Sequence, residues 1–348
     1  MHSKKTTIHD VARKAGVSAA TVSRVLNTPA IVREETRNRV LAVVQELSYV
    51  PNPLAKAFTH DRSRLVALII PSVLNANFAD IIRGAGYELS TEGYGLIIGN
   101  SEEELGQEVG ICRLLRDKAV DGVIFAFGTG DAPPVSELNP RAVTAFIDRE
   151  ADSPYVDTFF VDDTTGMRRI CGHLAELGHE RIGFLGGAPA TVTARRRRAA
   201  FLDALTGLGL PMIPGLHLDG EWTMAWGREG CKRLLSRPEP PTAIIACGDH
   251  LAIGALRGAA DIGRRVPEDV SIAGYDNSPL GRYTTPTLTT LSFPNYELGR
   301  RAARAIIRRL YQPGAAPLRW TFPLELVPGE SCGWLRNVVS RAAPGARS

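Results

Sequence analysis

The chain has 348 residues, which exceeds one typical domain, so we expect two or three compact units. Hydrophobic residues at 44% and charged residues at 22% describe an ordinary soluble globular protein. The formal net charge is only +4, but residues 1–62 hold 10 Lys/Arg against 5 Asp/Glu, and the remainder holds 31 against 32. The positive excess therefore lies on the first unit, where it would suit contacts with phosphate groups.

The cysteines argue against both a disulfide framework and a zinc site. They are scattered, odd in number and without C-x-x-C spacing, at Cys112, Cys171, Cys231, Cys247 and Cys332. The first residues, MHSKKTT, contain no apolar signal core, and no stretch approaches the length that spans a bilayer. We therefore expect a cytoplasmic protein with reduced thiols, no metal and no contact with a membrane.

Residues 7–27, TIHDVARKAGVSAATVSRVLN, have the pattern of two short helices joined by a tight turn. Thr7 and Asp10 have the spacing of a capping box. Gly16 ends the first helix, because glycine enters the left-handed conformation without steric cost, and Ser18 is placed to cap the second. This pattern is typical of a helix-turn-helix whose second helix enters the DNA major groove. A helical hairpin within a larger core is the structural alternative.

A third helix is expected over residues 34–48, with Val40, Val44 and Leu47 inward and no serine cap at Arg33. The segments DVARKAGVS-x-x-TVSRVLN and ETRNRVLAVVQELSYVPNPLAKAF closely resemble the N-terminal domain of the lactose repressor (LacI/GalR) family of transcription regulators. The resemblance implies a homodimer on double-stranded DNA, with the second helices in successive major grooves of a pseudo-palindromic operator.

The resemblance also implies which residues contact the operator. From the helix-turn-helix these are Thr7, Ser18, Ala19, Ala20, Thr21, Ser23, Arg24 and Asn27. Ala19 and Ala20 occupy positions that vary with target sequence in the family, and they offer only apolar contact, for instance with thymine methyl groups. More of the discrimination is then left to Arg24, the hinge and the shape of the DNA.

Residues 51–63 resemble the hinge helix of the same family, which orders when two subunits meet on the minor groove. Asn52 is a good helix cap, but the segment allows barely two turns and would be unstable alone. The resemblance implies minor-groove contacts from Asn52, Ala55 and Phe58. Phe58 stands where the family has a leucine that wedges between base pairs; packing on the core is its structural alternative.

From Leu65 onward, short apolar runs alternate with amphipathic helical stretches. The runs are residues 65–70, 94–100, 122–127, 143–148, 158–163, 181–187, 242–249 and 270–276, and the helices are 78–91, 103–116, 165–177, 195–208, 225–235 and 250–262. Such alternation predicts parallel sheets covered on both faces, with ligands beyond the carboxyl ends of the strands.

This part of the chain also resembles the family, through LGHERIGFLGG, GEWT, TAIIACGDHLAIGAL and VPEDVSIAGYDN. The resemblance implies an all-α helix-turn-helix domain with a hinge helix, followed by a two-lobed α/β core like a periplasmic binding protein. The expected bounds are residues 1–50 for DNA binding, 51–63 for hinge and linker, 64–339 for effector binding and dimerisation, and 340–348 for a flexible tail. Lobe one would hold 64–163 plus 293–322, and lobe two 164–292 plus 323–339.

A hydrophilic ligand in a cleft needs paired hydrogen-bonding groups for its hydroxyls and an apolar surface to stack on. Asp148 and Asp276 suit the acceptor role, Arg197 the donor role and Trp222 the flat surface. The resemblance implies an effector site formed by Asn75, Phe78, Asp148, Arg197, Trp222, Asp249, Asp276 and Phe293. Two residues depart from the family, since Gly248 replaces a common asparagine and Asn77 the more usual aromatic. Any one of the polar residues at the strand ends is equally well explained as a loop former or helix cap.

The run Arg195 to Arg198 spreads around a helix rather than forming one basic stripe, so we expect one arginine in the cleft and the others in solvent. A cleft arginine would suit a carboxylate or phosphate. Sugar acids and sugar phosphates therefore stay open beside neutral sugars.

No P-loop, H-E-x-x-H, G-x-S-x-G or paired cysteine ligand occurs, so we expect neither an enzyme nor a cofactor. His179 is interpreted as a structural cap rather than a catalytic base. The tail NVVSRAAPGARS is too short for a leucine heptad bundle, which favours a dimer. We expect a repressor of genes for carbohydrate uptake or catabolism, controlled by a sugar-like effector. A sugar-binding transport protein, a sugar-sensing activator and a carbohydrate enzyme with an added DNA-binding domain are the alternatives.

Overall fold

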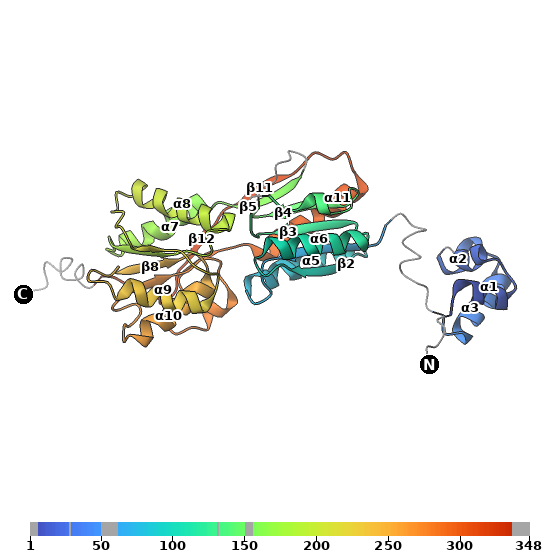
Figure 1. Ribbon diagram of the computed structural model, residues 1–348, viewed down its shortest axis with the longest axis horizontal. Helices are drawn as coiled ribbons and strands as arrows, with labels where there is room; N and C mark the ends of the chain where they lie inside the picture. The colour runs from blue at the N-terminus through green and yellow to red at the C-terminus, as the bar shows by residue number, and fades with distance from the viewer. Residues whose placement is uncertain (1–5, 28, 50–61, 131, 150–155, 336–348) are drawn as a thin grey trace, which may run out of the picture. The chain divides into compact units, whose positions relative to one another are not determined.

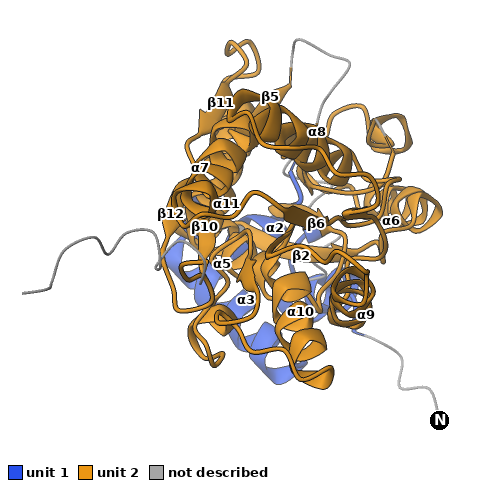
Figure 2. Ribbon diagram, turned by 90° about the vertical axis from the view of Figure 1, so that its left-hand side faces the viewer, with its two compact units in different colours: residues 1–63 blue, residues 64–348 orange. Residues whose placement is uncertain are grey.

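The computed structural model describes residues 6–27, 29–49, 62–130, 132–149 and 156–335. The chain separates into two compact units, residues 1–63 and 64–348, which are blue and orange in Figure 2. No helix in the described ranges is both long enough and apolar enough to cross a membrane.

The first unit is a small bundle of three α-helices, α1 (Ile8–Ala15), α2 (Ala19–Asn27) and α3 (Glu34–Glu46), with a 3-10 turn at Pro29–Ile31 (Figure 1). Its core consists of valines from all three helices and two alanines of α1, and Val11, Val22 and Val40 are fully buried. Val44 and Leu47, expected to face inward, pack partly buried against this core. The third helix ends two residues earlier than expected, at Glu46.

The predicted start and stop signals of these helices are present. Thr7 and Asp10 form a reciprocal capping box, and Gly16 has a φ of 66°. The Ser18 hydroxyl accepts a hydrogen bond from the Thr21 amide at 3.1 Å. As its sequence indicates, Arg33 makes no side-chain capping bond at the start of α3. The two helices and their turn are therefore held by local hydrogen bonds.

The second unit contains a six-stranded parallel sheet in the order β11-β5-β4-β3-β1-β2. Its strands are β1 (Leu65–Ile70), β2 (Gly95–Asn100), β3 (Gly122–Ala126), β4 (Val143–Ile147), β5 (Asp157–Val161) and β11 (Arg319–Phe322). The helices of this lobe are α5 (Asn77–Thr91), α6 (Leu105–Asp117) and α11 (Asn295–Tyr311). Helices α5 and α11 meet through Gly84 and Gly299, because a Cβ at either position would collide with the backbone of the other helix.

The other lobe contains a four-stranded parallel sheet in the order β7-β6-β8-β9. Its strands are β6 (Ile182–Leu185), β7 (His217–Leu218), β8 (Ala243–Ala246) and β9 (Ser271–Ala273). Helices α7 (Asp163–Glu176) and α8 (Val192–Gly207) cover one face, and α9 (Met224–Leu235) and α10 (Asp249–Asp261) cover the other (Figure 1). An antiparallel pair, β10 (Thr290–Ser292) and β12 (Glu325–Val327), completes the described strands.

Each of the eight apolar runs contains a strand, and each of the six predicted helices is present. The fold class is therefore the predicted one, a helix-turn-helix unit followed by a two-lobed α/β core with parallel sheets. The exact residues at which the lobes divide stay a prediction.

Candidate nucleic-acid interface and ligand cavity

Helix α2 buries one face and exposes the other. Val22 and Val25 are buried in the bundle, whereas Ser18, Ala20 and Arg24 are exposed. Thr7 is also exposed, and Ala19, Thr21 and Ser23 are half-buried. Asn27 is the last residue of α2. The predicted DNA-contact residues of the helix-turn-helix thus concentrate at the outer side of α2 and the start of α1. The three hinge residues predicted to contact DNA, Asn52, Ala55 and Phe58, lie outside the described residues.

The core contains a cavity of ≈ 50 Å³ at the carboxyl ends of strands from both large sheets. Pro71, Phe127 and Asp276 in its wall follow β1, β3 and β9. Six predicted effector residues line it, namely Asn75, Phe78, Arg197, Trp222, Asp276 and Phe293. Eight further residues line the cavity, and the sequence analysis did not assign them to the effector site. They are Pro71, Asn77, Glu103, Phe127, Gly128, Thr191, Thr193 and Asn295.

Arg197, on α8, is the buried centre of the cavity wall. Its Nη1 donates to the Cys247 carbonyl and lies 3.3 Å from Oδ1 of Asp276. Its guanidinium carbon lies 3.8 Å from the ring centre of Tyr275, and its Nε is 3.5 Å from Oδ1 of Asp163. Burial disfavours the charged form, but the neighbouring groups, Asp276 first, raise the pKa of Arg197 above its usual range. The guanidinium is therefore held as a cation by protein carboxylates.

Asp276 connects the two lobes inside the cavity. Its Oδ2 accepts a hydrogen bond from Nδ2 of Asn77, at the start of α5, at 2.5 Å. Its backbone φ of 120° is one that residues with a side chain rarely adopt, which is strain of the kind found at functional sites. Burial raises the pKa of Asp276 above its usual range, and Arg197 acts in the opposite direction.

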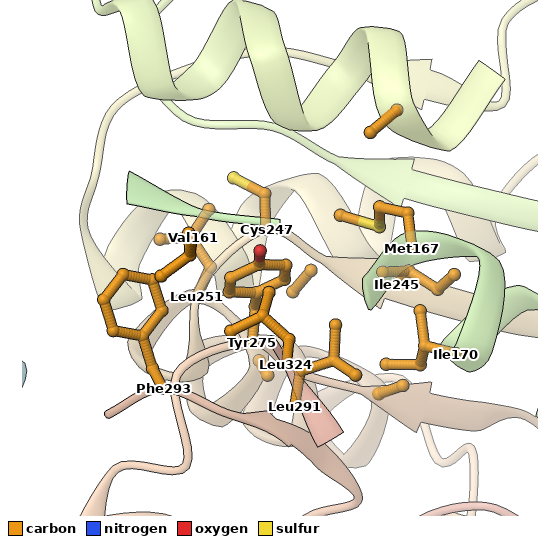
Figure 3. Close-up of a cluster of buried hydrophobic side chains, with 14 of the residues drawn as sticks. Val161, Met167, Ile170, Ile245, Cys247, Leu251, Tyr275, Leu291, Phe293 and Leu324 are labelled. Carbon is orange, nitrogen blue, oxygen red and sulfur yellow. The ribbon is translucent and has the colours of Figure 1, made fainter. Parts of the chain in front are cut away.

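An apolar cluster surrounds Tyr275, the ring nearest to the Arg197 guanidinium. Figure 3 shows the ring of Tyr275 among Leu251, Leu291 and Leu324, with Phe293 beside Val161. Tyr275 is fully buried, and its hydroxyl donates to Asp163. Because protein interiors are close-packed, this cluster fixes the ring on which the Arg197 guanidinium rests.

Trp222 supplies a flat wall of the cavity from the loop before α9. Its Nε1 donates to the Thr191 hydroxyl at 3.2 Å. A Cβ at Gly187 would collide with its ring, so glycine is needed there for the close approach. A Cβ at Gly248 would lie 3.3 Å from Oδ2 of Asp276 and 3.5 Å from the Trp222 ring. The longer side chain common in the family at Gly248 would therefore need these neighbours to move.

Asp148 and Asp249, the two other predicted carboxylates, do not line the cavity. Asp148 follows β4 and accepts from the Thr193 hydroxyl at 3.0 Å and from Arg196. Asp249 begins α10, and its oxygens accept from the Ser278 amide and the Thr290 hydroxyl, both at 2.6 Å. Both carboxylates are buried and engaged by protein donors. They support the cavity wall rather than face the cavity.

In the run Arg195 to Arg198, one arginine was expected in the cleft and the others in solvent, and the structure agrees only in part. Arg197 enters the cavity wall, and Arg198, half exposed, pairs with Asp219 at 2.7 Å. The expectation that the other arginines are solvated is wrong for Arg196, whose side chain is 26% exposed and bridges Asp148 and Asp163. The reason is helical spacing, because Arg196 and Arg197 lie three and four residues after Thr193 and share its face of α8.

His179 has the structural role that its sequence context indicates, although it does not cap a helix. The buried ring lies 3.0 Å from the Thr242 hydroxyl and 3.0 Å from the Gly333 carbonyl, and it joins segments distant in sequence. Among the described residues no group of His, Cys, Asp and Glu side chains is arranged to hold a metal ion. The five cysteines are unpaired, and burial raises the pKa of Cys112, Cys171, Cys231 and Cys247 to about 12.

Comparisons with known proteins agree with this architecture. Residues 7–52 match the model of the bacterial regulatory proteins of the lacI family, and residues 171–332 match that of a periplasmic binding protein-like domain. The HTH-type transcriptional repressor CytR of Escherichia coli (strain K12) is 33% identical over 306 residues, which cover 87% of this chain and 89% of CytR. The transcriptional regulator DegA of Bacillus subtilis (strain 168) is 33% identical over 93% of this chain and 97% of its own.

Solved structures give the same result for the three-dimensional fold. The lac repressor dimer bound to operator and the anti-inducer ONPF has a TM-score of 0.82, with 26% identity over 95% of this chain and 100% of that chain. The complex of the regulator CelR with cellobiose has a TM-score of 0.71, with 28% identity over 94% and 99%. The chain therefore belongs to the lacI family of bacterial regulatory proteins, the DNA-binding transcription regulators with a periplasmic-binding-protein-like core.

Proposed function

We propose that this protein is a repressor that binds a pseudo-palindromic operator as a homodimer and is controlled by a small polar effector in the core cavity. The observation that carries the proposal is the wall of that cavity, where Arg197, Asp276 and Trp222 lie together. The same chain has a helix-turn-helix in its first unit. Convergent polar groups beside aromatic rings are the usual composition of a small-molecule site.

The operator-binding side of the proposal rests on α2. Ala20 and Arg24 of α2, and Ser18 just before the helix, are exposed and lie outside the buried core of the bundle. Arg24 offers the planar fork that reads guanine or a phosphate, whereas Ala20 offers apolar contact alone. Direct base readout by α2 would then depend mainly on Arg24, with further selectivity from the shape of the DNA.

The control side of the proposal rests on a hydrogen bond that crosses the cavity. The Asn77–Asp276 hydrogen bond joins the lobes across the cavity, and a ligand that takes Asp276 must break it. Effector binding is thus tied to a change of core conformation.

The relatives support a carbohydrate as effector and an operator as target. CelR was solved with cellobiose, a lacI-family regulator from Enterococcus faecium with ribose, and the lac repressor with its operator. We infer that this protein acts in the cytoplasm on genes for uptake or catabolism of a carbohydrate. A sugar-sensing activator would use the same two sites, and the effect of the protein on transcription from its target promoter distinguishes the two.

The test is a footprint on DNA upstream of the protein's own gene, repeated with candidate effectors. We expect protection of a pseudo-palindrome whose half-sites lie about one helical turn apart, and a shift in affinity with an effector. Binding without sequence preference would contradict the operator assignment. Preserved operator binding that no effector shifts would contradict the control assignment.

A further inference from the structure

Arg197, the arginine in the cavity wall, is already paired with carboxylates of the protein. Arg197 faces Asp276 at 3.3 Å and Asp163 at 3.5 Å. Arg196, behind it, contacts Asp148 and lies 2.7 Å from Oδ2 of Asp163. Three carboxylates thus share two guanidinium groups, so both guanidinium groups have carboxylate partners before any ligand enters. An incoming carboxylate or phosphate would have to displace an aspartate from a buried ion pair, which is costly.

Most neutral donors in the wall are also engaged by the protein. The Trp222 indole N–H donates to the Thr191 hydroxyl, which itself donates to the Ala188 carbonyl at 2.8 Å. The Thr193 hydroxyl donates to Asp148. The side-chain donors of the wall without a hydrogen bond are Nε of Arg197, which lies 3.5 Å from Oδ1 of Asp163, and the uncharged amides of Asn75 and Asn295.

The wall also contains two side chains with acceptor oxygens that lack a partner. Oδ1 of Asn77 is buried and has no hydrogen-bond partner among the described residues, although the side chain is held by its Nδ2 bond to Asp276. The Glu103 carboxylate, in the loop between β2 and α6, makes no hydrogen bond or ion pair with any residue that the structure describes. A site with unpartnered acceptors is complementary to a ligand rich in donors.

Glu103 is fixed by its backbone rather than by its side chain. Its φ is 60°, in the left-handed region, and its amide donates to the Pro71 carbonyl at 3.1 Å. The Thr129 hydroxyl donates to its carbonyl at 2.5 Å. The carboxylate is therefore carried into the cavity wall on a strained, well-anchored turn while its own oxygens stay unpaired. Burial, together with Glu102 and Glu221, raises the pKa of Glu103 to about 7, as expected for a carboxylate that lacks a cation.

We infer that the effector carries a protonated amine that binds Glu103, and that the cavity rejects sugar acids and sugar phosphates. This inference rests on the proposed function, since it names the chemical class of the ligand in the same cavity. Hydroxyls of such a ligand would meet Asn77 and Asp276, and its ammonium would meet Glu103. The rings of Phe78 and Phe127 add a surface that favours a cation over an anion.

The test uses the full chain and matched sugars that differ in one group. Glucose, galactose and mannose are each compared with their 2-amino, uronic acid and 6-phosphate forms by thermal shift and calorimetry. We expect an amino sugar to bind at least about tenfold more tightly than its neutral parent, and the anionic forms to bind more weakly than the parent. Stronger binding of any anionic form, or no binding by any amino form, overturns the inference.

Two variants test whether Glu103 causes the preference for amino sugars over neutral sugars. Glu103→Gln keeps the shape and removes the charge, so the ratio of amino-sugar to neutral-sugar affinity should fall to about one. Glu104→Gln, one residue along the chain and exposed, removes the same charge outside the cavity wall and should leave the ratio unchanged. A ratio that survives Glu103→Gln, or that falls equally in Glu104→Gln, contradicts the role of Glu103. A purely structural role would lower both affinities without changing their ratio.

Operator binding, measured on the same samples by mobility shift, separates this inference from the proposed function. An anionic sugar that alters operator affinity overturns the amine inference and leaves the repressor assignment intact. If no specific operator binding is found, the repressor assignment is wrong. Calorimetry with the same sugars then still tests whether the cavity prefers an amine.

Discussion

The helix-turn-helix and the core cavity present their functional groups in opposite ways. On α2 the polar residues face outward, and their placement follows from helix periodicity within nine residues. In the cavity Arg197 and Asp276 are 79 residues apart, and both are buried in contacts with other charged groups. The first site therefore depends on local helix geometry, and the second on a long-range ionic network that the whole core must position. Each prediction below separates the two kinds of site.

The largest effect is expected for Asp276→Ala. It leaves the Arg197 cation buried without its nearest carboxylate in the cavity, and removing one partner of a buried pair costs about 3–5 kcal/mol. Denaturant unfolding of the core measures this loss, and calorimetry should show that effector binding is abolished. Asp203→Ala removes an exposed carboxylate on α8 and should change stability by less than about 0.5 kcal/mol. Equal effects of the two substitutions would contradict the ionic network.

Arg24→Ala should act on the operator alone. Loss of a base-reading arginine costs about 1–3 kcal/mol for each subunit, and discrimination among operator sequences should decrease with it. The matched control is Arg13→Ala, which removes an 80% exposed arginine from α1. Mobility shifts on specific and random DNA measure both. If Arg13→Ala weakened specific binding as much as Arg24→Ala, readout from the outer face of α2 would be ruled out.

Thr7→Ala should destabilise the first unit without affecting the core. The substitution removes the capping box, and the loss of such a cap costs about 0.5–2 kcal/mol. Thr7→Ser keeps a hydroxyl at the same position and should retain most of the stability. Amide hydrogen exchange in α1 measures the effect. Unchanged protection in Thr7→Ala would show that the cap does not limit the opening of α1.

The smallest effect is a pH dependence of amine binding. The pKa of Glu103 is raised to about 7 by burial, Glu102 and Glu221, so the carboxylate takes up a proton as the pH falls through that value. Affinity for an amino sugar should fall as the pH drops below about 7, because a protonated carboxyl no longer attracts an ammonium. It should also fall above the pKa of the sugar's own amine, which lies near that of an α-amino group. The pKa of Asp276 is also raised, by burial against the opposing effect of Arg197, and its protonation acts in the same direction.

Glu103→Gln separates these two contributions to the pH dependence. Only the parts that belong to Asp276 and to the amine of the sugar should remain in this variant. A pH profile identical to that of the unsubstituted protein would exclude Glu103 as the titrating group.

The contrast between the two sites also explains what the sequence predicted. Thr7, Gly16 and Ser18 are capping signals whose partners lie within three to five residues, so the helices of the first unit followed from local rules. The strands of the core followed from apolar runs such as residues 65–70, which coincide with β1. Helix α11 was not predicted, because arginines dominate its sequence and its apolar face consists largely of alanines that pack on α5.

The cavity was only partly predictable, since its chemistry depends on pairings between distant elements. The sequence predicted one site for Arg197, Asp276 and Trp222, and all three line the cavity. It could not show that Asp148 and Asp249 are engaged by Thr193 and Thr290. Glu103 was missed because an acidic residue at the start of a helix usually stabilises its N-terminus. The sequence signal that could have indicated Glu103 was the row of three glutamates before α6. In the structure two of these glutamates adopt positive φ.

The most direct test of the central claim is a linkage measurement between cavity and operator. The tightest ligand of the matched sugar series is titrated into free protein and into protein saturated with operator, and operator affinity is measured with and without that ligand. The account predicts that both affinities change by the same factor, and that Asp276→Ala abolishes the change. Operator affinity that stays constant while the ligand saturates the cavity would contradict the account.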